Sequence, residues 1–190
     1  SHSVDLWAGL GGGPLSKNEL LFSAQPGTAT TAELDAGKRW DVARGADRCV
    51  LRITNGVHAD SFSRGAHARL TAATFVVTPQ ASRGGIRLQD VDAMGDGQAG
   101  GLAPRSDFPS LRTEGEVVGA LQVPPGGQPI LLGPERATTG GYPKIAAVIA
   151  ADLWKLGQLR PGDRVRFVRV SFAQAARLWT EQRDALLREL

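Results

Sequence analysis

Residues 128–163 of this chain read QPILLGPERATTGGYPKIAAVIAADLWKLGQLRPGD. An apolar run over 129–132 leads into a polar segment over 136–144, and a second apolar run follows over 145–149. Short apolar runs on either side of a turn that contains Gly and Pro are typical of two strands joined by a loop. The sequence therefore predicts a strand, a loop and a strand, and this pattern favours a mainly β fold.

The loop between these two predicted strands gathers side chains that donate hydrogen bonds. Gly140 and Gly141 allow the backbone to bend or to approach a ligand closely, and Pro143 stiffens the exit. The polar groups are two hydroxyls, a phenol, a guanidinium and an ammonium, contributed by Thr138, Thr139, Tyr142, Arg136 and Lys144. We therefore expect the loop to hold an anion or a polar substrate.

The composition indicates one compact domain. The chain has 190 residues, is 42% hydrophobic, and places 24 Gly and 11 Pro mostly between short apolar runs, as in a turn-rich β fold. Its 22 basic and 19 acidic residues are scattered, so no nucleic-acid partner is predicted. Cys49 is a single cysteine, which excludes a disulfide framework. No apolar run approaches the ~20 residues of a membrane helix, and no signal peptide is recognisable, so we expect a cytoplasmic protein.

Other segments extend the β pattern and add helices. Strands are predicted over 49–53, 73–78, 85–89, 114–123 and 164–170, the last as an edge or closing strand with a bulge or a twist near Phe167. A turn over 124–127 predicts a hairpin into 129–132. Asp152 is expected to cap a helical turn over 153–156, and Ser171 with Gln174 forms a capping-box pattern before an amphipathic C-terminal helix. This helix can pack on the barrel or face a partner subunit.

Two acidic or histidine-containing segments invite comparison with metal sites. His58, Asp60 and His67 have no recognised ligand spacing, and Gly65 is expected to break any helix that would align them. The Asp- and Gly-rich loop over 90–112 resembles a calcium loop superficially but lacks its central Gly and closing Glu. We predict no metal site, and a functional or mobile role for the loop.

Further polar residues accompany the predicted strands. Arg83 and Arg87 can clamp a carboxylate or a phosphate if they share a strand face, or they are solvated edge charges. Glu114 and Gln122 flank the predicted strand over 114–123 and can face the same cavity as the loop, or bond at the edge of the core. Glu114 is the candidate general base.

Four blocks in order, GALQVPP (119–125), GQPI (127–130), TTGGYPKI (138–145) and DL with QLRPGD (152–163), resemble the allophanate hydrolase subunit 2 family. That family includes KipA, the C subunit of 5-oxoprolinase and the carboxyltransferase domain of biotin-dependent urea carboxylase. Weaker matches lie in other parts of the chain, at 10–15, 55–62 and 83–88. The resemblance implies a cyclophilin-like β-barrel domain over 46–190, and a segment over 1–45 that leads out of a missing N-terminal lobe.

This resemblance also implies a function. It points to a subunit of an ATP-dependent 5-oxoprolinase or allophanate-hydrolase-like complex that acts on a cyclic amide or urea-type substrate. The partners would be a KipI-like protein (allophanate hydrolase subunit 1, the B subunit of 5-oxoprolinase) and a LamB/YcsF-type A subunit. ATP would serve the complex, because this chain has no Walker loop. The alternatives are a biotin-dependent carboxyltransferase of urea carboxylase type and a non-catalytic KipA-like binding module.

Within this family, Lys144, Tyr142 and Glu114 are the candidate catalytic residues. The candidate substrate-binding residues lie on the loop and the neighbouring strands: Arg83, Arg87, Gln122, Arg136, Thr138, Thr139, Gly140, Gly141 and Pro143. Four positions depart from the family pattern, and they point to a changed substrate or to an interaction role: Ser82 for Asp, Ile86 for Tyr, Glu135 for Asp and Ala137 for Gln.

Overall fold

The computed structural model describes residues 49–92, 102–107 and 111–189. The segment predicted over 1–45 and part of the loop predicted over 90–112 lie outside these residues. The proposed boundary between residues 45 and 46 therefore stays a prediction.

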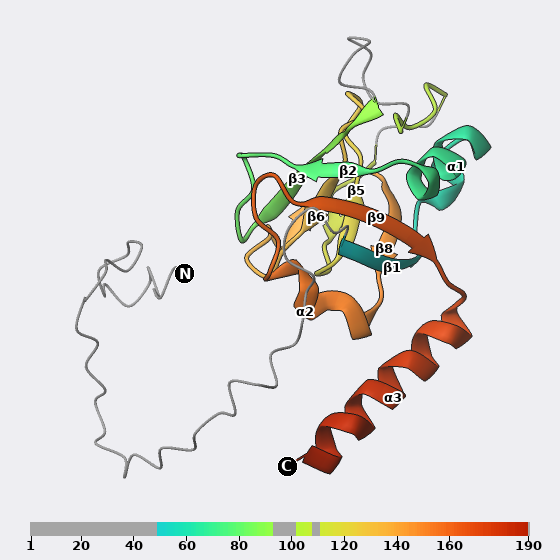
Figure 1. Ribbon diagram of the computed structural model, residues 1–190. Helices are drawn as coiled ribbons and strands as arrows, with labels where there is room; N and C mark the ends of the chain where they lie inside the picture. The colour runs from blue at the N-terminus through green and yellow to red at the C-terminus, as the bar shows by residue number, and fades with distance from the viewer. Residues whose placement is uncertain (1–48, 93–101, 108–110, 190) are drawn as a thin grey trace. The chain divides into compact units, whose positions relative to one another are not determined.

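Seven strands close into a barrel in the order β1-β8-β5-β6-β3-β2-β9 (Figure 1). Neighbouring strands are antiparallel except β1 and β9, whose parallel pairing closes the barrel. The strands are β1 (Cys49–Asn55), β2 (Phe75–Val77), β3 (Gly85–Asp90), β5 (Ala120–Gln122), β6 (Ile130–Leu132), β8 (Lys144–Val148) and β9 (Arg164–Arg169). The predicted mainly β barrel is thus confirmed, as are the hairpin of β5 with β6 and the closing role of β9.

The barrel interior is filled by residues that alternate along the strands. In β1, Leu51 and Ile53 are fully buried whereas Val50, next to Leu51, is exposed, which is the period of a strand with one buried face. Phe75 of β2 and Phe167 of β9 pack with their ring centroids 5.5 Å apart. Full burial of each such side chain stabilises the fold by roughly 1.5–3 kcal/mol.

Two strand predictions are corrected by the structure. The segment 114–123 forms two strands, β4 (Glu114–Gly115) and β5, because Gly119 adopts a φ of 81° that breaks the extended conformation between them. Of the predicted bulge or twist near Phe167, the bulge is wrong, since β9 pairs with β1 in unbroken register from Val165 to Arg169. At the end of β9, the Arg169 guanidinium contacts Asn55 Oδ1 and His67 Nδ1.

The helices are short apart from the last. They are η1 (Ala59–Ser61), α1 (Arg64–Ala72), η3 (Ala150–Asp152), α2 (Leu153–Leu156) and α3 (Phe172–Glu189). The expectation that Gly65 breaks a helix is wrong. A helical Gly costs about 1 kcal/mol, but Ser63 Oγ caps α1 by accepting from Ala66 N at 3.1 Å, and Ala66 and Leu70 are buried.

Helix α3 begins at the predicted capping box. Ser171 N donates to Gln174 Oε1 at 2.8 Å, and Gln174 N donates to Ser171 Oγ at 3.2 Å. Its large apolar side chains remain accessible in the described structure, with Phe172 72% and Trp179 45% exposed. None of the described helices is long and apolar enough to cross a membrane.

Candidate functional site

A two-stranded sheet next to the barrel organises the candidate site. Strand β4 pairs antiparallel with β7 (Thr139–Gly140), so that Glu114 lies opposite Gly140 and Gly115 opposite Thr139. The backbone N–H of Glu116, just after β4, also donates to Thr138 O at 2.9 Å. The predicted loop is therefore fixed against the segment that carries two carboxylates.

Lys144, the first residue of β8, lies at the centre of this site with only 4% of its side chain exposed. Its Nζ donates to Glu114 Oε1 and lies 3.2 Å from Glu116 Oε1. An ammonium so thoroughly removed from water is tolerated because two carboxylates face it. The structure thus brings together Glu114 and Lys144, which the sequence placed at the same cavity.

Glu116 and Gln122 complete the buried part of the cluster. Gln122 Nε2 donates to Glu116 Oε1 at 2.5 Å, and the Glu116 side chain is 2% exposed. Gln122 was a predicted site residue, whereas Glu116 was missed. The signal was present, since two carboxylates two residues apart, at Glu114 and Glu116, share one side of an extended chain.

His58 is a second residue that the sequence analysis did not assign to this site. Lys144 N donates to His58 Nδ1 at 3.3 Å, while His58 Nε2 lies 3.5 Å from Glu114 Oε1. Because Nδ1 accepts, the ring proton of a neutral imidazole is on Nε2, facing the carboxylate. Gly56 makes this possible: a side chain there would collide with the backbone of Lys144.

The two histidines compared with metal ligands face different surroundings. His67 Nε2 lies 2.9 Å from Ala59 O, and its Nδ1 faces Arg169, away from the contacts of His58. Within the described ranges, no group of three or more His, Cys, Asp or Glu side chains is arranged to hold a metal ion.

Glu114 has a pKa below the usual carboxyl value, chiefly because Lys144 donates a hydrogen bond to it. Partial burial acts in the opposite direction, and the positive charge of Lys144 adds to the lowering. A carboxylate with a lowered pKa is a weaker base. The hydrogen bond from Lys144 Nζ gives Glu114 a role in positioning the ammonium, and its role as general base stays a prediction.

The Gly-Gly loop covers the buried carboxylate. A methyl group added at Gly140 would collide with Oε1 of Glu116 and lie 3.1 Å from Gln122 Nε2. A methyl group added at Gly141 would have Leu111 O as its nearest neighbour, at an ordinary contact distance of 3.7 Å. Gly140 is therefore the position at which the backbone must approach the cluster. Pro143 is buried, and its carbonyl accepts from Val123 N at 3.0 Å, which ties the loop exit to β5.

The remaining loop residues lie at the surface of the site. Tyr142 is 47% exposed, and the side chains of Thr138 and Thr139 are also exposed. The side chain of Arg136 contacts the backbone of Glu116, since Arg136 Nε donates to Glu116 O at 3.0 Å. Of these donors, the Arg136 guanidinium thus contacts the segment that carries Glu116, and the binding roles of Thr138, Thr139 and Tyr142 stay predictions.

The two other candidate arginines occupy different positions. The proposed shared strand face is not formed, since β3 begins at Gly85 and Arg83 lies before it, donating through Nε to Glu135 Oε1 at 2.7 Å. Arg87 is exposed and pairs by register with Ile130, which pairs in turn with Gln122. Arg87 and Gln122 therefore share a sheet face, with backbones about 10 Å apart.

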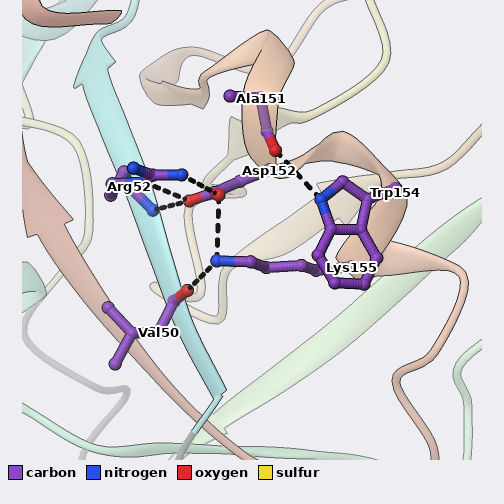
Figure 2. A network of polar contacts seen from close by, with 6 residues as sticks. All are labelled: Val50, Arg52, Ala151, Asp152, Trp154 and Lys155. Atoms are coloured by element: carbon purple, nitrogen blue, oxygen red, sulfur yellow. Dashed lines mark hydrogen bonds and ion pairs between the residues drawn. The ribbon is translucent and has the colours of Figure 1, made fainter. Parts of the chain in front are cut away.

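Asp152, which lies in one of the resembling blocks, forms a separate network (Figure 2). Its fully buried carboxylate accepts from Arg52 N, Nε and Nη2 at 2.8, 2.9 and 2.6 Å and pairs with Lys155 Nζ at 2.9 Å. Asp152 occupies the predicted N-cap position of α2, but its side chain makes no capping hydrogen bond, because these partners occupy the carboxylate. The network joins β1 to the segment η3–α2.

Comparisons with known proteins identify the family of this chain. The family model described as carboxyltransferase domain, subdomain A and B, matches residues 1–169. The C subunit of 5-oxoprolinase from Escherichia coli strain K12 is 32% identical over 132 residues, covering 70% of this chain and 39% of that protein. The corresponding protein of Haemophilus influenzae is 57% identical over 60 residues, covering 32% of this chain and 19% of that protein.

Urea-metabolising proteins are also similar. The urea amidolyase of Lachancea kluyveri is 28% identical over 181 residues, covering 93% of this chain and 10% of that protein. The crystal structure of the K. lactis urea amidolyase superposes with a TM-score of 0.57 at 28% identity, covering 72% of this chain and 8% of that one. The chain thus spans well under half of the length of each relative. Since the family model covers most of its residues, the chain belongs to the carboxyltransferase domain family, subdomains A and B.

Proposed function

We propose that this chain supplies one wall of the reaction site in an enzyme complex that hydrolyses a cyclic amide or urea-type substrate, as a component similar to the C subunit of 5-oxoprolinase. One observation carries the proposal: the ammonium of Lys144 is buried between Glu114 and Glu116, beneath the Gly-Gly loop. The sequence identity between this chain and the C subunits of 5-oxoprolinase from two bacteria supports the choice of substrate class.

The cluster suits chemistry at an amide carbonyl. When an amide is attacked, its carbonyl oxygen gains negative charge, and a preorganised cationic donor in a dry site stabilises that charge. Lys144 has three ammonium protons and faces two carboxylates, which leaves one proton for a ligand oxygen. In this proposal Lys144 polarises the substrate carbonyl, while Glu114 and Glu116 hold the ammonium in place.

The cluster does not suit a triphosphate. A triphosphate would present anionic oxygens to Lys144 itself, and these oxygens would be repelled by the carboxylates of Glu114 and Glu116. The amide edge that a lactam would present to Lys144 is neutral. ATP, which the proposed complex uses, is therefore assigned to a partner subunit. A KipI-like B subunit and a LamB/YcsF-type A subunit are the proposed partners.

Carboxyl transfer is the second candidate function. It is favoured by the likeness to urea amidolyase, which extends over 93% of this chain. The neutral ureido ring of biotin offers N–H donors and a carbonyl, which are compatible with a carboxylate acceptor and an ammonium donor. Carboxybiotin, formed beforehand by a biotin carboxylase, would supply the carboxyl group and would leave as biotin; Lys144 and Gln122 would hold and orient the ring.

Reconstitution distinguishes the candidates. The chain would be purified with the proposed A and B subunits and assayed for ATP-dependent conversion of 5-oxoproline to glutamate. It would be assayed separately with a biotin carboxylase and biotinylated carrier for carboxylation of urea. We expect the first reaction, and its loss in Lys144→Ala but not in the exposed helix variant Arg177→Ala. Urea carboxylation alone would establish the second candidate, and inactivity in both assays would support a non-catalytic KipA-like module.

A further inference from the structure

One oxygen of the Glu116 carboxylate has no hydrogen-bond partner among the described residues. Oε1 accepts from Gln122 Nε2 at 2.5 Å and lies 3.2 Å from Lys144 Nζ, but Oε2 is buried and unpartnered. Among the described residues, two other buried oxygens also lack a hydrogen-bond partner, Thr78 Oγ1 and Gln182 Oε1, and both belong to neutral side chains. Glu116 is therefore the acidic group for which a missing donor matters most.

A buried polar group without a partner is costly. An unmade hydrogen bond costs about 1–3 kcal/mol, and more when the group is charged. Native structures accordingly satisfy the great majority of buried polar atoms, and the exceptions mark functional sites, bound ions or water. The second oxygen of Glu116 thus points to a donor that the described residues do not supply.

The surroundings of Glu116 connect this oxygen to the candidate site. Gly140 covers the carboxylate with backbone only, and the cluster runs from Glu114, 39% exposed, to Lys144 and Glu116, which are almost fully buried. An acceptor, Oε2 of Glu116, is consequently placed close to a cationic donor, the Nζ of Lys144. A ligand that fits both must present an N–H and a C=O on the same edge.

We propose that Glu116 Oε2 accepts the N–H of a cis amide, a lactam or ureido group, whose carbonyl oxygen accepts from Lys144 Nζ. This inference rests on the proposed function and assigns the residues that would recognise the amide edge of its substrate. In an open-chain secondary amide the bond is almost always trans, so the N–H and C=O point to opposite sides. In a lactam the ring forces them to the same side. The pair Glu116 and Lys144 therefore selects cyclic or ureido amides over linear peptides.

The test compares ligands that differ at one atom. Binding to the complex of the chain with its partner subunits would be measured by calorimetry for 5-oxoproline, its N-methyl derivative and the lactone with ring oxygen in place of N–H. We expect the lactam to bind at least about tenfold more tightly than either analogue, since one hydrogen bond to a charged group is lost. This comparison needs no variant, so it holds even if a substitution prevents folding.

A variant locates the effect at Glu116. In Glu116→Gln, the amide oxygen is expected to keep facing Gln122 and Lys144, which places the NH₂ group where Oε2 was. The preference should therefore fall towards equality or reverse in favour of the lactone. Glu181→Gln, the same change at an exposed carboxylate of α3, should keep the lactam preference.

The outcomes separate the two proposals. Turnover of 5-oxoproline with equal binding of lactam and lactone would overturn the role of Glu116 while leaving the proposed function intact. The same conclusion would follow if Glu116→Gln kept the original preference, because a structural water would then be the partner of Oε2. Absence of both lactam binding and turnover would overturn the proposed function and this inference with it.

Discussion

Lys144 Nζ lies 3.2 Å from Glu116 Oε1, and both side chains are almost fully buried, with 4% and 2% exposed. This ion pair connects the first residue of β8 to the segment between β4 and β5. A buried pair adds little stability relative to a well-packed apolar pair, but removal of one member leaves the other charge uncompensated. The pair is therefore a sensitive point for both folding and activity.

Lys144→Met should lower the free energy of unfolding at pH 7 by about 3–5 kcal/mol, because it leaves the buried carboxylate of Glu116 without its cation. The double variant Lys144→Met with Glu116→Gln should recover part of this loss, since no buried charge then remains in the pair. Urea denaturation of the two single variants and the double variant measures the coupling. Additive losses would show that the two side chains do not interact.

Glu114→Gln should change how stability depends on pH. The pKa of Glu114 is lower in the folded chain than in the unfolded chain, where it is about 4.3. Ionised Glu114 therefore contributes stability above that value, and the contribution disappears as the pH falls through the folded-state pKa. The difference in unfolding free energy between wild type and Glu114→Gln should be largest near neutral pH and shrink below about pH 4.

Urea denaturation at a series of pH values provides the measurement for this variant. Glu181→Gln, at an exposed carboxylate of α3 that is 61% accessible, is the matched control and should show a much smaller difference at every pH. A difference for Glu114→Gln that grows towards acid pH would contradict the ion pair with Lys144.

Local sequence patterns predicted the secondary structure that depends on residues close together in the chain. The strands β6 and β8 and the loop between them followed from apolar periodicity around Gly140 and Gly141, and the α3 capping box from Ser171 and Gln174. The family resemblance added the closed barrel. These features could be predicted because propensity, turn chemistry and burial pattern agree over a few consecutive residues.

Contacts between distant segments could not be predicted in this way. His58 meets the backbone of Lys144, 86 positions along the chain, because Gly56 allows β1 to turn directly against β8. The division of the predicted strand 114–123 followed from the backbone conformation of Gly119, which periodicity does not register. The missed residues of the site are thus those whose positions depend on the closed barrel.

Gly140→Ala should impair the candidate site without a large effect on the barrel. The added methyl group would displace the end of the Glu116 side chain, and with it the hydrogen bond from Gln122, while the barrel strands stay paired. We expect a loss of lactam binding and of turnover in the reconstituted complex. Gly141→Ala is the matched control, since its nearest neighbour would be at an ordinary contact distance of 3.7 Å, and it should retain both. Equal effects of the two variants would show that the loop backbone alone, and not its approach to Glu116, matters.

Asp152→Asn should destabilise the barrel without involving the candidate site. Asp152 is fully buried, and its carboxylate receives three hydrogen bonds from Arg52 besides the ion pair with Lys155 (Figure 2). Burial acts to raise the pKa of Asp152, but the hydrogen bonds from Arg52 and Lys155 outweigh it and hold the pKa below its usual value. Its stabilising effect is thus present above the unfolded-state pKa of about 3.9 and is lost as the pH falls through the folded-state value.

The loss expected for Asp152→Asn at pH 7 is about 3–5 kcal/mol, the range for breaking a buried ion pair by removing one partner. Asp107→Asn is the matched control, because Asp107 pairs with Arg105 at a position where both side chains are more than half exposed, at 65% and 53%. Chemical denaturation should show a clear decrease for the first variant and almost none for the second. Similar decreases for both would mean that the network around Asp152 does not stabilise the junction of β1 with η3 and α2 more than a surface pair does.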